Sequence, residues 1–250
     1  MAAFDLPLIQ ALTGDPALPV YAFDTIDSTN TECRRRLGAG QARCLVLSDA
    51  QSAGRGRRGR SFFSPAGAGL YMSLAFRPEG GPAAAVGVTT YAAVCVAEAV
   101  EDLTGLRCGI KWVNDLYLDG KKVCGILAEA IGDAVVVGIG VNLTPAAAPE
   151  ELRGVVGCLG REGIRDALAG EIAGRLLRYR SGDAGHMAEY RRRSVVLGRR
   201  VRFGERAGLA AAIGDDGALA VDTDEGRVLL RAGEISLEEI EGLRGMDRTD

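Results

Sequence analysis

Residues 51–60 read Gln-Ser-Ala-Gly-Arg-Gly-Arg-Arg-Gly-Arg, with three glycines interleaved among four arginines. Gly54, Gly56 and Gly59 disfavour a helix and weaken a strand, because glycine loses the most backbone entropy on ordering. The unhindered N–H groups of such a loop can surround an anion, and guanidinium groups match carboxylate or phosphate geometry. We therefore expect a mobile loop that binds an anionic ligand.

The segments on both sides of this loop are apolar. Residues 44–47 (Cys-Leu-Val-Leu) precede it and residues 70–76 (Leu-Tyr-Met-Ser-Leu-Ala-Phe) follow it, and both predict buried strands. An Arg-Gly tail that binds RNA is the alternative, but such tracts usually lie in disordered segments. A loop between two core strands favours an active site.

Length and composition limit the functional classes. A chain of 250 residues with 47% apolar content can bury one large domain and a small one. The net charge of -3 argues against general nucleic-acid affinity. The sequence contains no stretch long and apolar enough to span a membrane. We expect a cytoplasmic protein with no nucleic-acid or membrane partner.

Cysteine and histidine usage narrows the chemistry. The six cysteines form no CxxC pair and follow no signal peptide, which predicts small buried side chains in a reducing compartment. His186 is the single histidine, and beside Gly182 and Gly185 it is expected at the surface or at a helix start. Catalysis should then depend on arginine and lysine electrostatics, which favours phosphoryl or nucleotidyl transfer. No protein metal site is expected.

A polar cluster at residues 27–32 (Asp-Ser-Thr-Asn-Thr-Glu) lies between an expected strand, residues 20–23, and a charged helical run ending at Leu37. These residue types favour helix capping. Several hydroxyl and amide groups at a positive helix terminus also make a site for a polar ligand. Both interpretations stay open at this point.

Residues 110–118 and 121–129 predict two strands joined by an Asp119-Gly120 hairpin turn. Alternation along the second strand places Lys122, Cys124 and Ile126 on one face, opposite Val123, Gly125 and Leu127. A third strand, residues 134–143, carries Gly138 and Gly140, which permit close approach of a ligand or of backbone, and Asn142 at its end.

Helices and short strands account for the rest of the chain. One short helix is expected within residues 1–20 and a long one over residues 82–104. Residues 164–179 predict another helix, and residues 191–193 end a further short one. Short strands with turn signals follow, which suggests a small barrel; they span residues 195–203, 209–213, 218–222 and 227–230.

Together these segments resemble the biotin-protein ligase family over about residues 20–143, with weaker agreement to residue 237. The matching residues are Asp27 to Asn30, Gln51 to Gly59, Phe63 to Pro65, Lys111, Trp112, Asn114 to Tyr117, Lys122, Gly125 to Leu127, Glu129, Gly138 to Asn142 and Gly233 to Leu237. Departures from the family pattern are Phe62, Val113 and Cys124. The resemblance implies an α/β (α+β) fold, with a class II aminoacyl-tRNA synthetase-like catalytic domain over residues 1–193, a small SH3-like β-barrel over 194–242 and a tail over 243–250.

The resemblance also implies an activity. Members make biotinyl-5′-AMP from biotin and ATP, with Mg²⁺ bound mainly through the ATP phosphates. They then transfer biotin to a lysine of a biotin carboxyl carrier protein of acetyl-CoA carboxylase or a related carboxylase. Repressor members carry an N-terminal winged helix-turn-helix, for which about twenty residues before the first strand are too few, so no DNA regulation is expected. The oligomeric state stays open, with a homodimer as one option.

The resemblance assigns roles by position. It implies that biotin binds Ser28, Thr29, Asn30, Gln51, Gly54, Arg55, Gly56, Arg57 and Lys122. ATP would contact Arg57, Lys111, Asn114, Lys122 and Asn142. Lys122, Arg57 and Arg55 would be catalytic. The alternatives are a lipoate or octanoate ligase or transferase on the same fold, which the Arg-Gly loop and the Lys122 hairpin disfavour, and a non-enzymatic biotin or nucleotide sensor, which the set of basic residues disfavours.

Overall fold

The structure is a computed structural model that describes residues 4–78, 85–146, 148–180 and 182–237. The first three residues of the long helix expected over 82–104 lie outside the described residues. So do residues 238–242 of the proposed small domain and the tail over 243–250.

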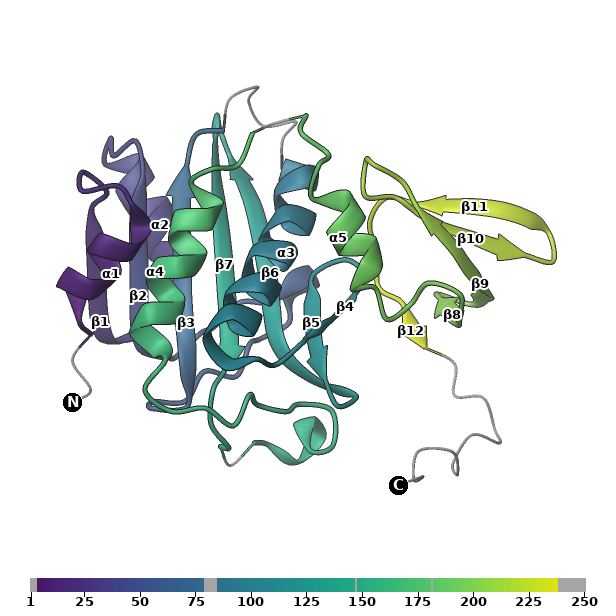
Figure 1. The fold of residues 1–250 in the computed structure, drawn as a ribbon, viewed down its shortest axis with the longest axis horizontal. Coiled ribbons are helices and arrows are strands. Elements are labelled where there is room, and N and C mark those ends of the chain that lie inside the picture. Colours follow the sequence, from purple (N-terminus) through teal and green to yellow (C-terminus); the bar gives the residue numbers. More distant parts are fainter. Residues whose placement is uncertain (1–3, 79–84, 147, 181, 238–250) are drawn as a thin grey trace.

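A seven-stranded sheet forms the large part of the molecule (Figure 1). Its strand order is β1-β2-β3-β7-β6-β5-β4. Strands β1 and β2 are parallel, and every other neighbouring pair is antiparallel. The strands are β1 (Val20–Ile26), β2 (Cys44–Gln51), β3 (Gly69–Phe76), β4 (Gly109–Lys111), β5 (Asp115–Leu118), β6 (Lys121–Ile131) and β7 (Ala134–Asn142).

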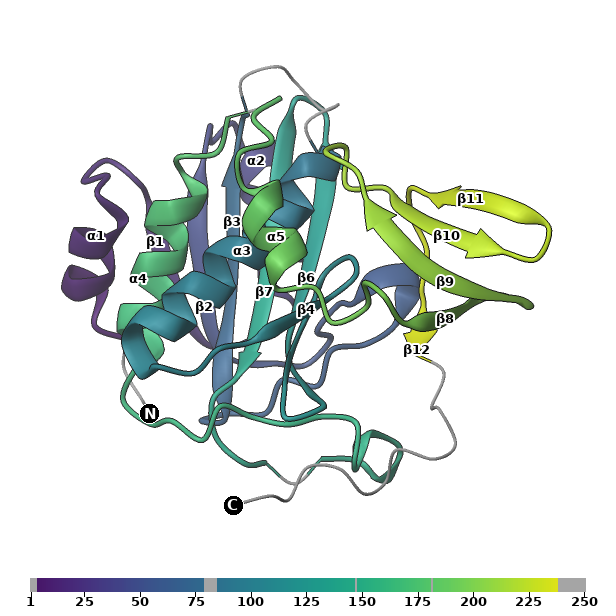
Figure 2. The same ribbon diagram turned by 45° about the vertical axis from the view of Figure 1, so that its right-hand side comes forward.

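Helices cover the two faces of this sheet unequally. Helices α1, α3 and α4 lie on the face towards the viewer in Figure 1, whereas α2 packs against β2, β3 and β7 on the opposite face. Turning the molecule shows α5 beside α3, near the small sheet (Figure 2). The helices are α1 (Leu6–Thr13), α2 (Thr29–Gly38), α3 (Ala85–Thr104), α4 (Arg165–Leu176) and α5 (Met187–Arg192), with 3₁₀ turns at Arg57–Gly59 and Glu150–Leu152.

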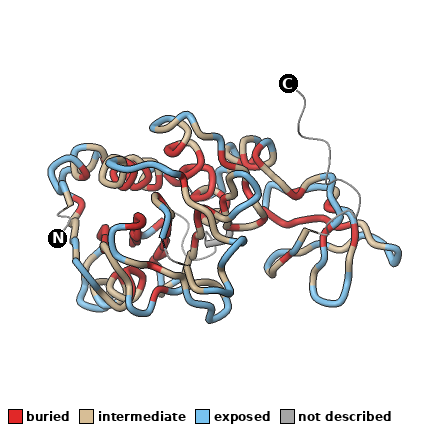
Figure 3. Tube along the Cα trace, turned by 90° about the horizontal axis from the view of Figure 1, so that it is seen from below, coloured by how far each residue is buried: buried red, intermediate tan, exposed pale blue. Residues whose placement is uncertain are grey.

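Alternation in the central strands separates the core from the second face. On β3, Met72 and Leu74 join the hydrophobic core, while Ser73 between them contacts residues of α2. Its cross-strand partner on β7 is Gly138, and Tyr71 is paired with Gly140. Buried residues are concentrated between the layers (Figure 3). The face of the sheet towards α2 thus carries small and polar side chains at these positions, whereas the opposite face packs into the hydrophobic core.

Two expectations about the hairpin are wrong. Residues 110–118 are not one strand, because the chain turns at residues 112–114 and β4 pairs antiparallel with β5. Lys122 does not share a face with Cys124 either. A register shift in the β5–β6 pairing places the Lys122 ammonium beside Gly125 and Asp115, since one extra residue reverses the alternation. The Asp119-Gly120 turn is confirmed, with φ of 50° and 74°.

A second sheet of five strands follows, in the order β11-β10-β9-β8-β12. The strand expected over 195–203 is shorter than predicted, and the one expected over 218–222 is shifted by one residue. The strands expected over 209–213 and 227–230 begin earlier than predicted, and β12 adds a fifth strand. This sheet contacts the large part directly, because Trp112 Nε1 donates to the Gly217 carbonyl at 2.9 Å. The strands are β8 (Arg200–Phe203), β9 (Arg206–Ile213), β10 (Leu219–Thr223), β11 (Gly226–Leu230) and β12 (Ser236–Leu237).

The predicted burial of the cysteines and the predicted position of His186 at a helix start agree with the structure. Five cysteines are buried and Cys158 is half-buried, all with free thiols. Burial raises the pKa of the Cys95 thiol to about 12, which disfavours the reactive thiolate. His186 precedes α5 as expected, but it is half-buried, with Nε2 2.8 Å from Thr90 Oγ1. Among the described helices, none combines the length and the apolar character needed to cross a membrane.

Candidate active site

A cavity of about 350 Å³ lies against the α2 face of the large sheet. Glycines of β6 and β7 form its floor, and a Cβ atom there would collide with the walls. At Gly138 it would lie 2.0 Å from Asn30 Oδ1, and at Gly140 it would lie 2.3 Å from the Phe62 ring. At Gly125 it would lie 3.0 Å from the same ring. The missing side chains therefore define the depth of the cavity.

One wall consists of hydroxyl and amide groups at the start of α2. The Thr29 backbone N–H donates to Gln51 Oε1 at 2.9 Å, and the Gln51 amide donates to Ser64 Oγ at 2.8 Å. Ser73 Oγ lies 2.7 Å from Thr29 Oγ1. Ser28 is the N-cap residue of α2, yet its hydroxyl makes no capping hydrogen bond within the described chain. This wall is ordered by its own hydrogen bonds and suits a neutral polar ligand.

Glu129 joins this wall to the arginine loop. Its carboxylate accepts a hydrogen bond from Asn30 Nδ2 at 2.8 Å and pairs with Arg34 at 2.8 Å and with Arg55 at 3.3 Å. The Glu129 side chain is only 14% exposed. One carboxylate therefore neutralises charge from α2 and from the loop while it orients the Asn30 amide, a role that the sequence did not indicate.

The opposite wall is basic. Among the described residues that line the cavity, five carry a positive charge and two a negative charge. Lys122 Nζ lies 2.8 Å from Asp115 Oδ1, and Arg57 donates to Asn114 Oδ1 at 2.8 Å. Arg60 pairs with Glu234 at 2.8 Å. This excess of positive charge suits an anionic ligand such as a phosphate chain.

Lys111 lies on the same wall, with its ammonium 5.4 Å from the centre of the Tyr117 ring. Burial lowers the pKa of Lys111 and outweighs the opposing effect of the Asp115 carboxylate, while the nearby Lys122 ammonium acts in the same direction as burial. Deprotonation therefore begins at a lower pH than for an ordinary lysine.

We predict that nucleotide binding weakens as the pH rises towards this lowered pKa. The Lys111→Arg variant keeps its charge, so its nucleotide affinity should stay constant over the same alkaline range. Titration calorimetry with ATP at a series of pH values measures the difference. Parallel pH profiles for the two proteins would contradict the role of the Lys111 charge.

The loop at residues 51–60 folds back on itself. Arg55 and Ser61 form an isolated antiparallel bridge, and Arg58 has a φ of 56°. Gly54 is buried, and a Cβ atom there would lie 2.4 Å from the Phe62 carbonyl oxygen, so no other residue fits without a shift. The mobility expected of this loop stays a prediction.

The cavity gathers nearly every predicted site residue. Gly54 is buried and is not among the described lining residues. The predicted residues that line the cavity are Ser28, Thr29, Asn30, Gln51, Arg55, Gly56, Arg57, Lys111, Asn114, Lys122 and Asn142. Sequence reasoning assigned no cavity role to Phe62, Asp115 or Tyr117. It also missed Leu152, Val155, Val156 and the segment 233–235, which arrive from distant parts of the chain. For the last segment, the matching Gly233 to Leu237 ending was the available signal.

Magnesium commonly binds through one or two carboxylates, several waters and substrate phosphates. Asp115 supplies a carboxylate to the cavity. In the described part of the chain, no three His, Cys, Asp or Glu side chains gather into a group that could hold a metal ion. This donor set fits an Mg²⁺ ion that arrives bound to the nucleotide phosphates and would reduce their negative charge. Asp115 and Glu234 are the lining carboxylates that could contact such an ion.

Comparisons with known proteins agree with this geometry. The model of the biotin/lipoate A/B protein ligase family matches residues 22–143. The chain is 37% identical to a biotin--[acetyl-CoA-carboxylase] ligase of Paracoccus denitrificans, covering 84% of this chain and 96% of that protein. A ligase of the same name from Mycobacterium tuberculosis is 32% identical and is matched over 91% of each chain.

Solved structures give the same result for the fold. A biotin protein ligase from Aquifex aeolicus, in complex with biotin and ATP, superimposes with a TM-score of 0.74 at 26% identity. The match covers 89% of this chain and 99% of that one. The mixed α/β fold with a class II synthetase-like catalytic sheet, expected from the sequence, is thereby confirmed.

Proposed function

The chain belongs to the biotin--[acetyl-CoA-carboxylase] ligase family, and we propose that its cavity activates biotin with ATP and passes the biotinyl group to a carrier protein. The observation that carries this proposal is the pairing of two unlike walls in one cavity. The Thr29 and Gln51 wall supplies fixed donors and acceptors for the neutral ureido ring of biotin. The basic wall with Lys122 and Arg57 receives the carboxylate and the phosphates.

In the first step, a biotin carboxylate oxygen attacks the α-phosphorus of ATP. A new P–O bond forms, the bond to pyrophosphate breaks and pyrophosphate leaves with its electron pair. The step brings two anions together, so fixed positive charge is the main requirement and no general base is needed. We propose that Lys122 and Arg57 exchange Asp115 and Asn114 for the substrate oxygens.

In the second step, the unprotonated ε-amine of an acceptor lysine attacks the acyl carbon of biotinyl-5′-AMP. An amide bond forms, AMP leaves and the amine loses a proton. Before transfer, water can hydrolyse the mixed anhydride, so the site must exclude it. We propose that the loop at residues 51–60 covers the intermediate, and that the acceptor is a carrier domain of acetyl-CoA carboxylase or a related carboxylase.

Lipoate or octanoate activation is the second candidate reaction. A ureido ring can exchange hydrogen bonds with the polar wall around Thr29, where the Ser28 hydroxyl makes no capping bond to any described residue, whereas an aliphatic chain or a dithiolane ring offers no donor to it. ATP–pyrophosphate exchange with biotin, lipoate and octanoate tests the assignment. Exchange with biotin alone is expected; exchange driven by lipoate, or binding of biotin with no exchange, would overturn it.

We predict that loop closure protects the arginines at residues 55–60 from trypsin. Ordering glycine-rich backbone is entropically costly, and the ion pairs of Arg55 with Glu129 and of Arg60 with Glu234 are too exposed to hold the loop closed by themselves. Incubation with biotin and Mg-ATP should therefore slow cleavage at Arg55, Arg57, Arg58 and Arg60, whereas ATP alone should slow it little. Mass spectrometry of the fragments assigns the cut sites. Equal cleavage in both conditions would show that the loop is not a lid.

We further propose that the chain divides near residues 193 and 194, with an SH3-like barrel built on the five-stranded sheet. The strand order and short turns of that sheet support this assignment. We also propose a cytoplasmic location, where ATP and an acetyl-CoA carboxylase carrier domain would both be available to the enzyme.

A further inference from the structure

The segment 110–114 carries two of the nucleotide-facing side chains, Lys111 and Asn114, on a turn between two very short strands. Its outer edge is held by backbone from beyond α5. The Ile110 N–H donates to the Arg193 carbonyl at 2.7 Å, and the Val195 N–H donates to the Ile110 carbonyl at 2.9 Å. Residues 193–195 therefore pair with the outer edge of β4 and extend the sheet there.

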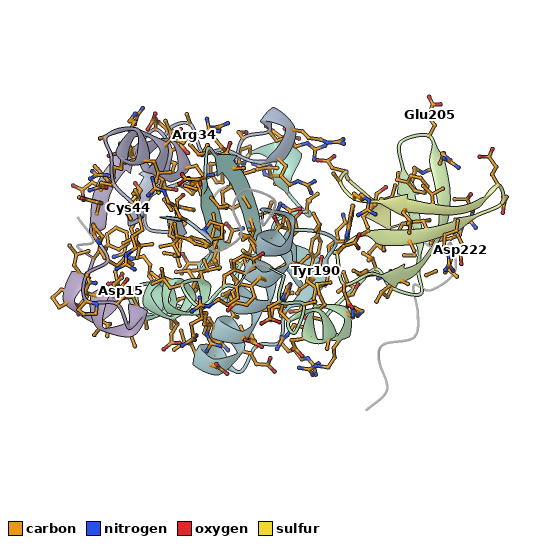
Figure 4. All side chains as sticks on the ribbon, turned by 90° about the horizontal axis from the view of Figure 1, so that it is seen from above. Asp15, Arg34, Cys44, Tyr190, Glu205 and Asp222 are labelled. Carbon is orange, nitrogen blue, oxygen red and sulfur yellow. The ribbon has the colours of Figure 1, made fainter. Side chains whose placement is uncertain are left out.

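Tyr190 of α5 holds the middle of the same segment. Its hydroxyl donates to the Val113 carbonyl at 3.0 Å, and the residue is 0% exposed. Burial raises the pKa of the Tyr190 phenol, and the nearby Asp115 carboxylate acts in the same direction, so the group stays a donor at every physiological pH. In Figure 4, Tyr190 lies between the helices of the large sheet and the small sheet.

The hydrogen bond from Tyr190 to the Val113 carbonyl matters because Val113 is next to a residue that lines the cavity. Val113 lies directly before Asn114, whose carbonyl accepts from the Ile126 N–H at 3.0 Å and whose Oδ1 accepts from Arg57 at 2.8 Å. Rotation of the Val113 peptide would therefore move Asn114 and Lys111, the two side chains of this turn that line the cavity. The biotin wall around Thr29 and Gln51 lies on other elements and would stay in place.

We propose that Tyr190 is a positioning residue for the nucleotide half of the site. It acts through the Val113 carbonyl, which fixes the turn that presents Lys111 and Asn114. The inference rests on the proposed function only in naming ATP as the ligand of this half.

The Tyr190→Phe variant tests the proposal by removing one hydroxyl. The Tyr91→Phe variant is a matched control, since the Tyr91 hydroxyl donates to the Arg175 carbonyl at the same 3.0 Å but away from the residues that line the cavity. In ATP–pyrophosphate exchange, Tyr190→Phe should raise the KM for ATP about tenfold and leave the KM for biotin within about twofold, in line with losing one buried hydrogen bond. Tyr91→Phe should change neither.

Two outcomes would overturn the proposal. An unchanged KM for ATP in Tyr190→Phe would show that the turn needs no hydroxyl, and equal rises in both KM values would indicate a general loss of structure. Thermal unfolding of both variants shows whether equal rises in the KM values come with a loss of stability. Wild-type exchange with biotin and ATP reports on the proposed function separately.

Discussion

The Lys122→Ala variant is expected to form biotinyl-5′-AMP at least about 100-fold more slowly than the wild type, a loss of roughly 2.7 kcal/mol of transition-state stabilisation. The reaction joins a carboxylate to a phosphate, and a fixed ammonium offsets their repulsion. The β5–β6 bulge and the Asp115 carboxylate, 2.8 Å from Lys122 Nζ, place this ammonium at the cavity. Biotin affinity should fall much less.

Single-turnover pyrophosphate release measures the first step directly. The matched control is Lys121→Ala, which removes the same charge from the neighbouring, exposed position of the hairpin outside the main cavity. Its rate should equal that of the wild type. An unchanged rate in Lys122→Ala, or equal losses in both variants, would contradict the catalytic role of Lys122.

The Gly138→Ala variant is expected to lower biotin affinity by about 100-fold. Its Cβ atom would lie 2.0 Å from Asn30 Oδ1, so the Asn30 side chain must leave its place between Ser73 and Glu129. Breaking these two bonds costs about 1–3 kcal/mol each where buried groups stay unpaired, and the displaced amide would occupy ligand space.

A double-mutant cycle with Asn30→Ala tests whether the loss of biotin affinity in Gly138→Ala arises from the contact with Asn30. The Asn30→Ala change removes the side chain that collides, so adding Gly138→Ala to it should cost little further affinity. Titration calorimetry with biotin gives all four affinities, and far-ultraviolet circular dichroism shows whether each variant is folded. Additive losses would mean that the two residues act independently and that the close contact has no effect on binding.

The sequence was most informative where local residue types determine geometry. The glycine and arginine pattern of residues 51–60 predicted an irregular loop between strands, and Asp119-Gly120 predicted the tight turn that the structure contains. The buried strands around Leu45 and Leu74 followed from apolar runs alone. The cavity residues were found through the family resemblance, because single side chains such as Asn114 carry no local signal.

The errors came from interactions between segments distant in sequence. Alternation placed Lys122 on the wrong face because the register shift depends on how β5 and β6 pair, which no local pattern determines. The turn at residues 112–114 depends on bonds to Gly217 and Tyr190, over 70 residues away. Glu129 and Glu234 joined the site for the same reason, since each carboxylate finds its partners only after folding.

The glycines of β6 and β7 form one side of the cavity, and the residues after the arginine loop form another. Strands β6 and β7 are hydrogen-bonded to neighbouring strands on both sides. The backbone at Gly125, Gly138 and Gly140 is therefore rigid and cannot move to accommodate a thicker ligand. The arginine loop is followed closely by Phe62, whose ring lies against Gly125 and Gly140, so this part of the chain bounds the same space from the other side. A ligand of a different thickness would therefore require matched changes in the sheet glycines and in the residues that follow the arginine loop, because neither side can change alone without a collision.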